Sequence, residues 1–320
     1  METVDVAVNV FAKPFQTALS LLSLLACSGR HVDTVWLQFE PAGSKFDEIT
    51  TYHIADYLKE QLGARCRVFQ PDFWLARHAV EPERIGDVSY RMGIRYQYAF
   101  EQSGKDKLFL MHNDVLVLRD ILGPMLEAMG DSFAIGAIGQ CWNCPASHGD
   151  LMRDVLGRGP CTPSSYADFQ PGYDELRRLY SVARERGIFL RPYDEGFDGM
   201  FDRQPWPLPE CRVSEWACLL DLGKTRPLCI PQGDGFSPGA FRQCGTGFLD
   251  TGVAWFRDMH REGLRARNFD IRPYLKHWVG TGNKTRRRYS LAENNALILL
   301  RKHYPRYLEW LSKKCGRSFL

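Results

Sequence analysis

Residues 107–118 read Lys-Leu-Phe-Leu-Met-His-Asn-Asp-Val-Leu-Val-Leu, and this stretch decides the fold. Its first part, 107–111, is almost entirely apolar and predicts a buried strand. The polar triplet His112, Asn113 and Asp114 follows directly. In open α/β sheets, ligands bind at the carboxyl ends of the strands, and a carboxylate there suits Mg²⁺ or Mn²⁺. The Asn-Asp pair equally suits a simple turn, so the triplet alone leaves both interpretations open.

Strands and helices alternate around this stretch. A proline early in a helix and a glycine after its last turn mark the first helix, which begins near Pro14 and ends before Gly29. Such alternation predicts βαβ units, and therefore an α/β fold with a mixed, mostly parallel sheet flanked by helices. The predicted strands are 5–12, 35–39, 66–69, 107–111 and 133–138, and the further helices are 50–62 and 89–102.

The second half of the chain has a different texture. Residues 140–245 carry most of the prolines and many glycine turns, with one clear helix at 174–187. We interpret this part as a loop-rich insertion or second lobe, between an α/β half at 1–139 and a returning part at 246–320. The returning part would begin with a strand at 248–256 and end in helices over 290–314. One continuous domain is the expected organisation.

Composition argues against a disordered, collagenous or coiled-coil protein. The chain has 320 residues, of which 44% are hydrophobic and 25% charged, as in ordinary globular proteins. Its formal net charge of +3 gives little support for nucleic-acid binding. No apolar run reaches the length of a membrane span, and the first residues lack a basic signal region. We expect a cytoplasmic protein, with Lys313, Lys314 and Arg317 as a possible contact to the inner face of the membrane.

A second polar segment, 277–284, reads His-Trp-Val-Gly-Thr-Gly-Asn-Lys. Glycines such as Gly280 let a backbone approach phosphates closely, Lys284 can neutralise a diphosphate, and His277 can bind a metal. Arg91 and Arg95, four residues apart in a predicted helix, would share a face, and one of them could reach the nucleotide or diphosphate. A surface pair near Glu101 and Asp106 is the alternative for the two arginines.

Four cysteines of the loop-rich part form a candidate zinc site. Cys141 and Cys144 make a C-x-x-C pair, and Cys161 and Cys211 follow at longer spacing. Four thiolates are a suitable tetrahedral set for structural Zn²⁺, which would stabilise a region with few regular elements. Free buried thiols are the alternative.

The order of these features resembles glycosyltransferases of the GT-A fold, which use nucleotide-sugar donors. In that family an Asp-X-Asp motif ends a central strand and holds a divalent metal; here His112-Asn113-Asp114 stands in its place. Two further segments are similar to the glycogenin and lipopolysaccharide galactosyltransferase branch. Phe248–Val253 resembles its Phe-Asn-Ser/Thr-Gly-Val strand, and His277 with Gly280 and Lys284 resembles its His-X-X-Gly-X-X-Lys motif. The lysine lies one position later than in that motif.

The resemblance implies a set of roles. Mn²⁺ or Mg²⁺ would be held by Asp114, His112 and His277, and an acid near the sugar would serve as the catalytic group. The acidic candidates are Asp250, Asp194 and Glu195. The donor would contact Val10, Phe11, Ala12, Arg91, Arg95, Asn113, Gly280 and Lys284.

The implied reaction is metal-dependent transfer of a sugar from a nucleotide-sugar donor to a glycan or lipid-linked acceptor, as in polysaccharide biosynthesis. A cation and Lys284 would stabilise charge on the departing diphosphate. Two alternatives are kept. A zinc-stapled binding protein without catalysis is one. A sugar nucleotidyltransferase is the other, although the 11–15 loop lacks the glycines that such enzymes usually carry.

Overall fold

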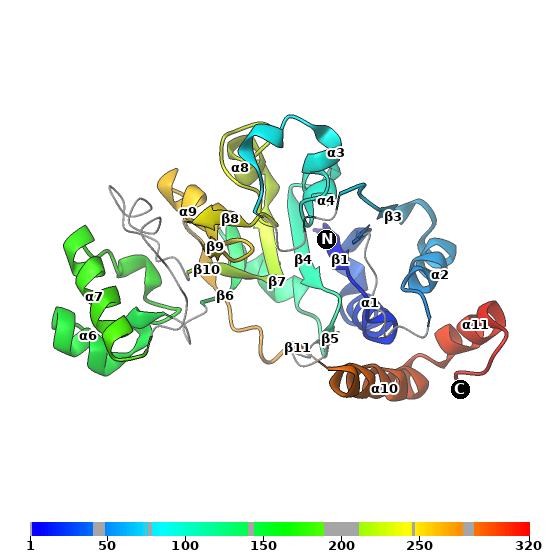
Figure 1. Ribbon diagram of the computed structural model, residues 1–320. Coiled ribbons are helices and arrows are strands. Elements are labelled where there is room, and N and C mark those ends of the chain that lie inside the picture. Colours follow the sequence, from blue (N-terminus) through cyan, green and yellow to red (C-terminus); the bar gives the residue numbers. More distant parts are fainter. Residues whose placement is uncertain are drawn as a thin grey trace.

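The computed structural model describes residues 2–40, 49–73, 75, 79–139, 144–188, 211–244, 247–277 and 285–320. Its centre is a seven-stranded sheet in the order β10-β6-β7-β4-β1-β2-β3 (Figure 1). All neighbouring strands are parallel except β7, which runs antiparallel to β4 and β6. The prediction of an α/β fold with a mixed, mostly parallel sheet is therefore confirmed. The strands are β1 (Val4–Val10), β2 (Val32–Phe39), β3 (Cys66–Phe69), β4 (Lys107–His112), β6 (Ala134–Ile138), β7 (Val213–Asp221) and β10 (Arg267–Asn268).

Helices and two small sheets complete the described chain. β5 (Val115–Val117) pairs with β11 (Leu275–His277), and β8 (Arg242–Cys244) pairs with β9 (Gly247–Leu249). The helices are α1 (Pro14–Ser28), α2 (Tyr52–Leu62), α3 (Val88–Arg91), α4 (Gln97–Gln102), α5 (Leu122–Met129), α6 (Gly149–Leu156), α7 (Tyr173–Glu185), α8 (Leu222–Thr225), α9 (Val253–Arg261), α10 (Arg286–His303) and α11 (Pro305–Cys315).

The sheet is buried on both faces because its central strands carry apolar side chains at successive positions. In β4, Phe109 and Met111 join one apolar cluster, whereas Leu108 and Leu110 join the other. The first cluster contains residues of α1, α2, α5, α10 and α11, and the second contains residues of α4, α6, α7 and α9. Side chains that alternate between two helix layers are what a period of two residues in a strand requires.

The predicted helix over 89–102 is wrong in its middle. α3 ends at Arg91 and α4 begins at Gln97, after Tyr96 at a left-handed φ of 62°. The Gln38 amide donates to the carbonyl oxygens of Met92 and Ile94, in the turn between the two helices. Arg91 and Arg95 therefore do not share one helix face.

The predicted strand over 248–256 is also wrong for most of its length. β9 ends at Leu249, and α9 begins at Val253 after Gly252, whose φ of 81° makes a turn. β9 pairs with β8 and lies outside the main sheet. The strand next to β4 is instead β7, which the sequence analysis did not predict. The C-terminal helical stretch is divided at Pro305, which begins α11.

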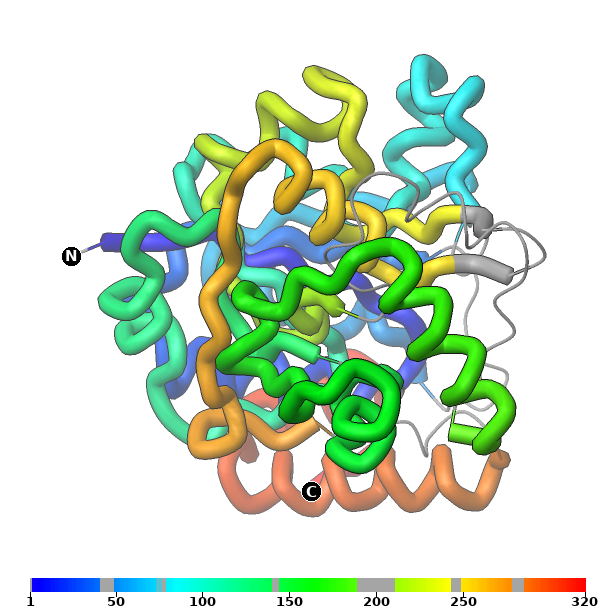
Figure 2. Tube along the Cα trace, turned by 90° about the vertical axis from the view of Figure 1, so that its left-hand side faces the viewer, coloured from blue at the N-terminus to red at the C-terminus, as the bar shows by residue number. Residues whose placement is uncertain are grey.

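The part between β6 and β7 contains a helical pair that lies beside the sheet edge formed by β6 and β10. α6 and α7 appear at the left in Figure 1 and in front of the sheet in Figure 2. Their buried residues, including Met152 and Leu179, join the same apolar cluster as β6 and β7. Among the helices of the described ranges, none combines the length and the apolarity needed to cross a membrane.

Candidate metal centre

Three side chains that the sequence analysis singled out meet at the carboxyl end of β4. One ligand atom each from His112, Asp114 and His277 lies within 4.8 Å of the other two, and we call these three side chains the metal group. His277 Nε2 is 3.1 Å from Asp114 Oδ1, and His112 Nδ1 is 3.9 Å from the same oxygen. In the part of the chain that the structure describes, no other set of three or more His, Cys, Asp or Glu side chains has its ligand atoms this close together.

The pairing of two short strands brings His277 to this position. β5 begins one residue after Asp114 and runs antiparallel to β11, so that Val115 is paired with His277. On its other side the His277 ring stacks on Trp216 of β7, with ring centroids 4.6 Å apart and planes 11° apart. Backbone hydrogen bonds and a ring contact thus hold His277 next to Asp114, although the two residues are 163 positions apart in sequence.

Asp114 is a buried carboxylate in cationic surroundings. Lys13 Nζ lies 2.6 Å from its Oδ2, and both side chains are largely buried. Burial alone would raise the pKa of Asp114, but the hydrogen bond from His277 and the charge of Lys13 outweigh it and hold that pKa well below its ordinary value. The carboxylate is therefore ionised at neutral pH, as a metal ligand must be.

The turn that presents Lys13 is strained. Ala12 and Lys13 have φ values of 55° and 61°, which side-chain-bearing residues adopt at a cost of about 1–3 kcal/mol each. The Asn113 amide donates to the carbonyl oxygens of Phe11 and Ala12, and the Tyr289 hydroxyl accepts from the Lys13 amide at 2.8 Å. Asn113, directly after β4, and Tyr289 of α10 thus hold the segment after β1 in a conformation that brings Lys13 to Asp114.

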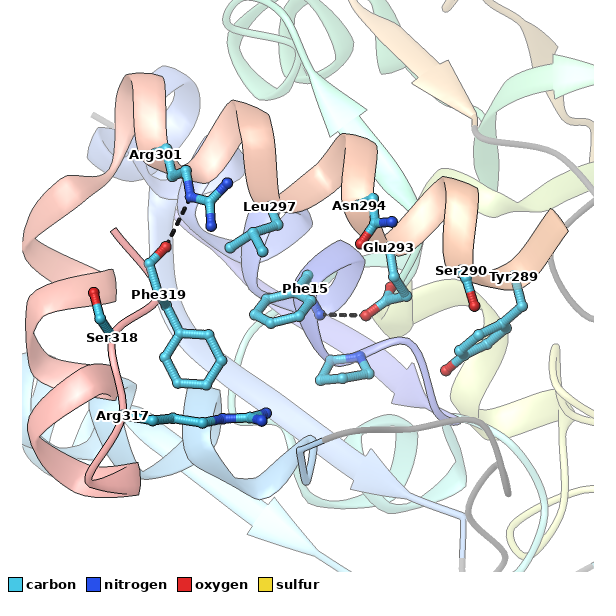
Figure 3. Close-up of a pocket in the computed structure, with 11 residues that line it drawn as sticks. Phe15, Tyr289, Ser290, Glu293, Asn294, Leu297, Arg301, Arg317, Ser318 and Phe319 are labelled. Carbon is cyan, nitrogen blue, oxygen red and sulfur yellow. Dashed lines mark hydrogen bonds between the residues drawn. The ribbon is translucent and has the colours of Figure 1, made fainter. Parts of the chain in front are cut away.

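The first turn of α1 is held by the same helix, α10. Lys13, at the N-cap, offers no side-chain cap. Instead, the Glu293 carboxylate accepts from the backbone amide of Phe15 at 2.9 Å (Figure 3). It also accepts from the backbone amide of Gln16 at 3.2 Å. A carboxylate at a helix N-terminus satisfies free amides and opposes the positive end of the helix dipole. α10 therefore contributes two polar anchors to the segment that carries Lys13.

A second polar group lies beside His112, on the side away from Asp114. His112 Nε2 is 3.5 Å from Glu215 Oε1, and the other Glu215 oxygen is ion-paired with Arg212. Arg212 also donates to the Thr251 carbonyl oxygen and lies 3.4 Å from Asp250. Burial would raise the pKa of Glu215, but Arg212 and His112 lower it below its ordinary value. Glu215, Arg212 and Asp250 thus form one connected polar group next to the three candidate ligands.

The three ligand residues fit a divalent cation. Two donors that are each about 2.1 Å from one ion are about 3–4.2 Å apart, and both distances from Asp114 Oδ1 lie in this interval. Two imidazoles and one carboxylate are a known ligand set for first-row transition metals. Imidazole nitrogens suit these ions better than Mg²⁺, which prefers oxygen ligands.

The predicted donor-binding residues separate into two places. Val10, Phe11 and Ala12 lie at the end of β1 beside the metal group. Arg95 lies 3.0 Å from Glu40, which also accepts from Asn9, the β1 residue paired with His112. Arg91 points elsewhere. It is buried against Glu101 and the Ile85 carbonyl oxygen, and the structure does not bring it to the metal group.

Several predicted residues lie outside the described ranges. These are Asp194, Glu195, Gly280, Lys284 and Cys141. Of the predicted zinc ligands, Cys144, Cys161 and Cys211 are described and buried, but they are not a group of three close donors. The zinc site with Cys141 stays a prediction.

Sequence reasoning missed the residues that surround the three candidate ligands. Glu215, Arg212 and Trp216 were overlooked because β7 lies in a part of the chain dominated by proline and glycine. The apolar run 216–220 was the available signal for this strand, with a glutamate beside it. Tyr289 and Glu293 lie four residues apart on α10, a spacing that places two side chains on one face of a helix.

Comparison with known proteins gives only distant similarity. No family model matches the chain, and no curated protein sequence matches it. A mannosyltransferase, PcManGT from Pyrobaculum calidifontis in complex with GDP-Man and Mn²⁺, is 12% identical with a TM-score of 0.41, over 84% of this chain and 55% of that chain. An active-site mutant of LgtC is 18% identical with a TM-score of 0.34, over 71% of this chain and 60% of that chain.

A third similar structure is glucosyl-3-phosphoglycerate synthase from Mycobacterium tuberculosis with Mn²⁺, UDP-glucose and phosphoglyceric acid. It is 11% identical with a TM-score of 0.37, over 83% of this chain and 69% of that chain. Sugar-transferring enzymes of this kind are the class that the sequence motifs resemble. This chain spans less than two thirds of the length of the first two structures.

Proposed function

We propose that this protein is a metal-dependent glycosyltransferase that moves a sugar from a nucleotide-sugar donor to a glycan or lipid-linked acceptor. The observation that carries the proposal is the meeting of His112, Asp114 and His277 within 4.8 Å at the carboxyl end of β4. The motif order that resembles GT-A glycosyltransferases requires an acid after the central strand and a C-terminal histidine to share one site. In this protein they are 3.1 Å apart.

The three ligand residues give the site its chemistry. A divalent ion bound by them would supply positive charge against which a departing diphosphate is stabilised. Lys13, which follows β1 and is paired with Asp114, adds a second positive charge to the site. Lys284, seven residues after His277, would approach the same diphosphate. A site with fixed charges stabilises developing negative charge without reorganisation.

The end of β1 is the proposed donor-binding edge. Val10, Phe11 and Ala12 would line the pocket for the nucleotide base, and Arg95 would reach the nucleotide or its phosphates. The Asn113 amide nitrogen is already committed to the turn at Phe11 and Ala12. In this proposal Asn113 therefore acts by holding that turn, and Gly280 lets the following loop approach the phosphates.

The acid that serves the acceptor or the sugar is proposed to be Asp250. It is partly exposed, and Arg212 links it to Glu215 and so to His112. A carboxylate that is about one-third exposed can meet both a sugar hydroxyl and solvent, which a fully buried one cannot. Asp194 and Glu195 remain proposed alternatives.

A donor screen tests this function. Sugar nucleotides that differ in base and sugar are added with Mn²⁺, and the melting temperature is measured, because a ligand that binds the native state raises it. The positive donor is then incubated with enzyme to follow slow release of nucleoside diphosphate. We expect one donor class to stabilise the protein only in the presence of metal, and to be hydrolysed.

Two outcomes would contradict the proposal. Stabilisation by a donor without any turnover, with or without acceptor sugars, would indicate a binding protein. Release of pyrophosphate from a nucleoside triphosphate and a sugar phosphate would indicate a nucleotidyltransferase instead.

A further inference from the structure

The His112 ring lies between two carboxylates. Its Nδ1 faces Asp114 Oδ1 at 3.9 Å, and its Nε2 faces Glu215 Oε1 at 3.5 Å. A histidine binds a metal through one ring nitrogen, and the hydrogen bond made by the other nitrogen decides which one it is. Glu215 lies on the Nε2 side, which leaves Nδ1 as the nitrogen directed to the metal group.

Glu215 is itself fixed. Its Oε2 is ion-paired with Arg212, and both side chains are about nine-tenths buried. Arg212 is anchored in turn on the Thr251 carbonyl oxygen and on Asp250. A carboxylate held in this way cannot rotate to follow the imidazole, so the imidazole must orient itself to the carboxylate.

We propose that Glu215, held by Arg212, is a positioning residue that fixes His112 as an Nδ1 ligand of the divalent cation. The inference rests on the metal-binding part of the proposed function. Histidines that bind metals commonly donate their second N–H to a carboxylate, which sets the ring orientation and raises the basicity of the ligand. His112 stands where GT-A glycosyltransferases have the first aspartate of their motif. Glu215 then supplies a carboxylate that contacts the histidine instead of the metal.

A plain electrostatic role for Glu215 is the alternative that the test must separate. A carboxylate near a cation favours its binding even without orienting a ligand. The two roles differ in their dependence on His112. Orientation disappears when His112 is removed, whereas direct attraction persists.

The first experiment measures Mn²⁺ affinity of the full chain by electron paramagnetic resonance, without any nucleotide. We expect Glu215→Gln to weaken Mn²⁺ binding about 10–100-fold, the usual loss when such an outer partner is removed. In the His112→Ala background the same change should cause less than a twofold further loss. Equal losses in both backgrounds, or a loss below twofold in the first, would overturn the proposal.

The matched control is Glu101→Gln, which alters another buried Arg–Glu pair outside the metal group. Its Mn²⁺ affinity should equal that of the wild-type protein even if its melting temperature falls. A loss in this variant as large as that of Glu215→Gln would mean that general destabilisation explains both, and the proposal would fail.

The second experiment reads the imidazole directly. In protein loaded with Zn²⁺ as a diamagnetic probe, ¹⁵N spectra of the histidine rings should show His112 bound through Nδ1 and protonated at Nε2. Binding through Nε2 would overturn the proposal. These readouts are independent of turnover: metal bound as described without donor hydrolysis would refute only the proposed function, whereas absence of metal binding would refute both.

Discussion

Two buried Arg–Glu pairs in this protein have the same chemistry but different surroundings. Arg91 and Glu101 form a closed group: one Glu101 oxygen accepts from Arg91 Nε and the Gln97 amide, and the other accepts from Arg91 Nη2. Arg212 and Glu215 form an open group, since one Glu215 oxygen faces His112 at 3.5 Å. Arg212 Nε is buried and finds no acceptor among the described residues.

The difference shows how a buried ion pair serves stability in one place and a site in another. Burying two charges is costly, and the closed group recovers that cost through a full set of hydrogen bonds. In the open group, one Glu215 oxygen faces His112, which on its other side faces Asp114 of the metal group. Which role a pair has is decided by what surrounds it, and variants can separate the two.

The largest expected effect is on the metal group itself. Asp114→Ala removes the one carboxylate that both histidines face, so we expect Mn²⁺ affinity to fall more than about 100-fold while the circular dichroism spectrum is retained. Titration calorimetry with Mn²⁺ measures this loss. An affinity unchanged from wild type would place the metal elsewhere and remove the contrast between the two Arg–Glu pairs.

Stability should separate the two pairs in the opposite direction. Glu101→Gln leaves Arg91 as a buried charge without an ionised partner, and we expect the free energy of unfolding to fall by about 3 kcal/mol. Glu215→Gln should cost only about 1 kcal/mol, because Arg212 keeps Asp250 and the Thr251 carbonyl oxygen. Urea unfolding at pH 7 measures both; a larger loss for Glu215→Gln would contradict the comparison.

Acid provides a contrast between histidines. Unlike His112, His260 lies among Phe133, Tyr166 and Phe256, and burial lowers its pKa from 6.5 to about 3. The unfolded chain binds a proton at this histidine below pH 6.5, whereas the folded protein does not. The free energy of unfolding is therefore unaffected well above pH 6.5 and falls as the pH decreases, by about 2 kcal/mol at pH 5. In His260→Phe, the stability difference between pH 7 and pH 5 should shrink by that amount. The same pH dependence in variant and wild type would refute the assignment, and Mn²⁺ affinity at pH 7 serves as the control.

The smallest expected effect concerns the strained turn before α1. Tyr289→Phe removes the acceptor for the Lys13 amide and should lower the free energy of unfolding by about 1 kcal/mol. Mn²⁺ affinity should change by less than a few-fold, since Lys13 still reaches Asp114. Chemical denaturation measures the loss. An unchanged free energy of unfolding would show that Tyr289 does not stabilise the turn.

The sequence alone predicted the parts of the site that local pattern controls. His112 and Asp114 follow an apolar strand, and in open α/β sheets ligands bind at the carboxyl ends of the strands. Glu215 could not be assigned in this way, because its proximity to His112 depends on β7 lying antiparallel beside β4, a pairing between residues about 100 positions apart. The same holds for Tyr289 and Glu293, which the sequence does not distinguish from other polar residues of α10.

The most direct test of the account is a crystal grown with Mn²⁺ and measured at a wavelength where manganese scatters anomalously. The account predicts one strong peak within about 2.3 Å of His112 Nδ1, the Asp114 carboxylate and His277 Nε2. At saturating Mn²⁺, the absence of any peak between these three side chains would contradict it.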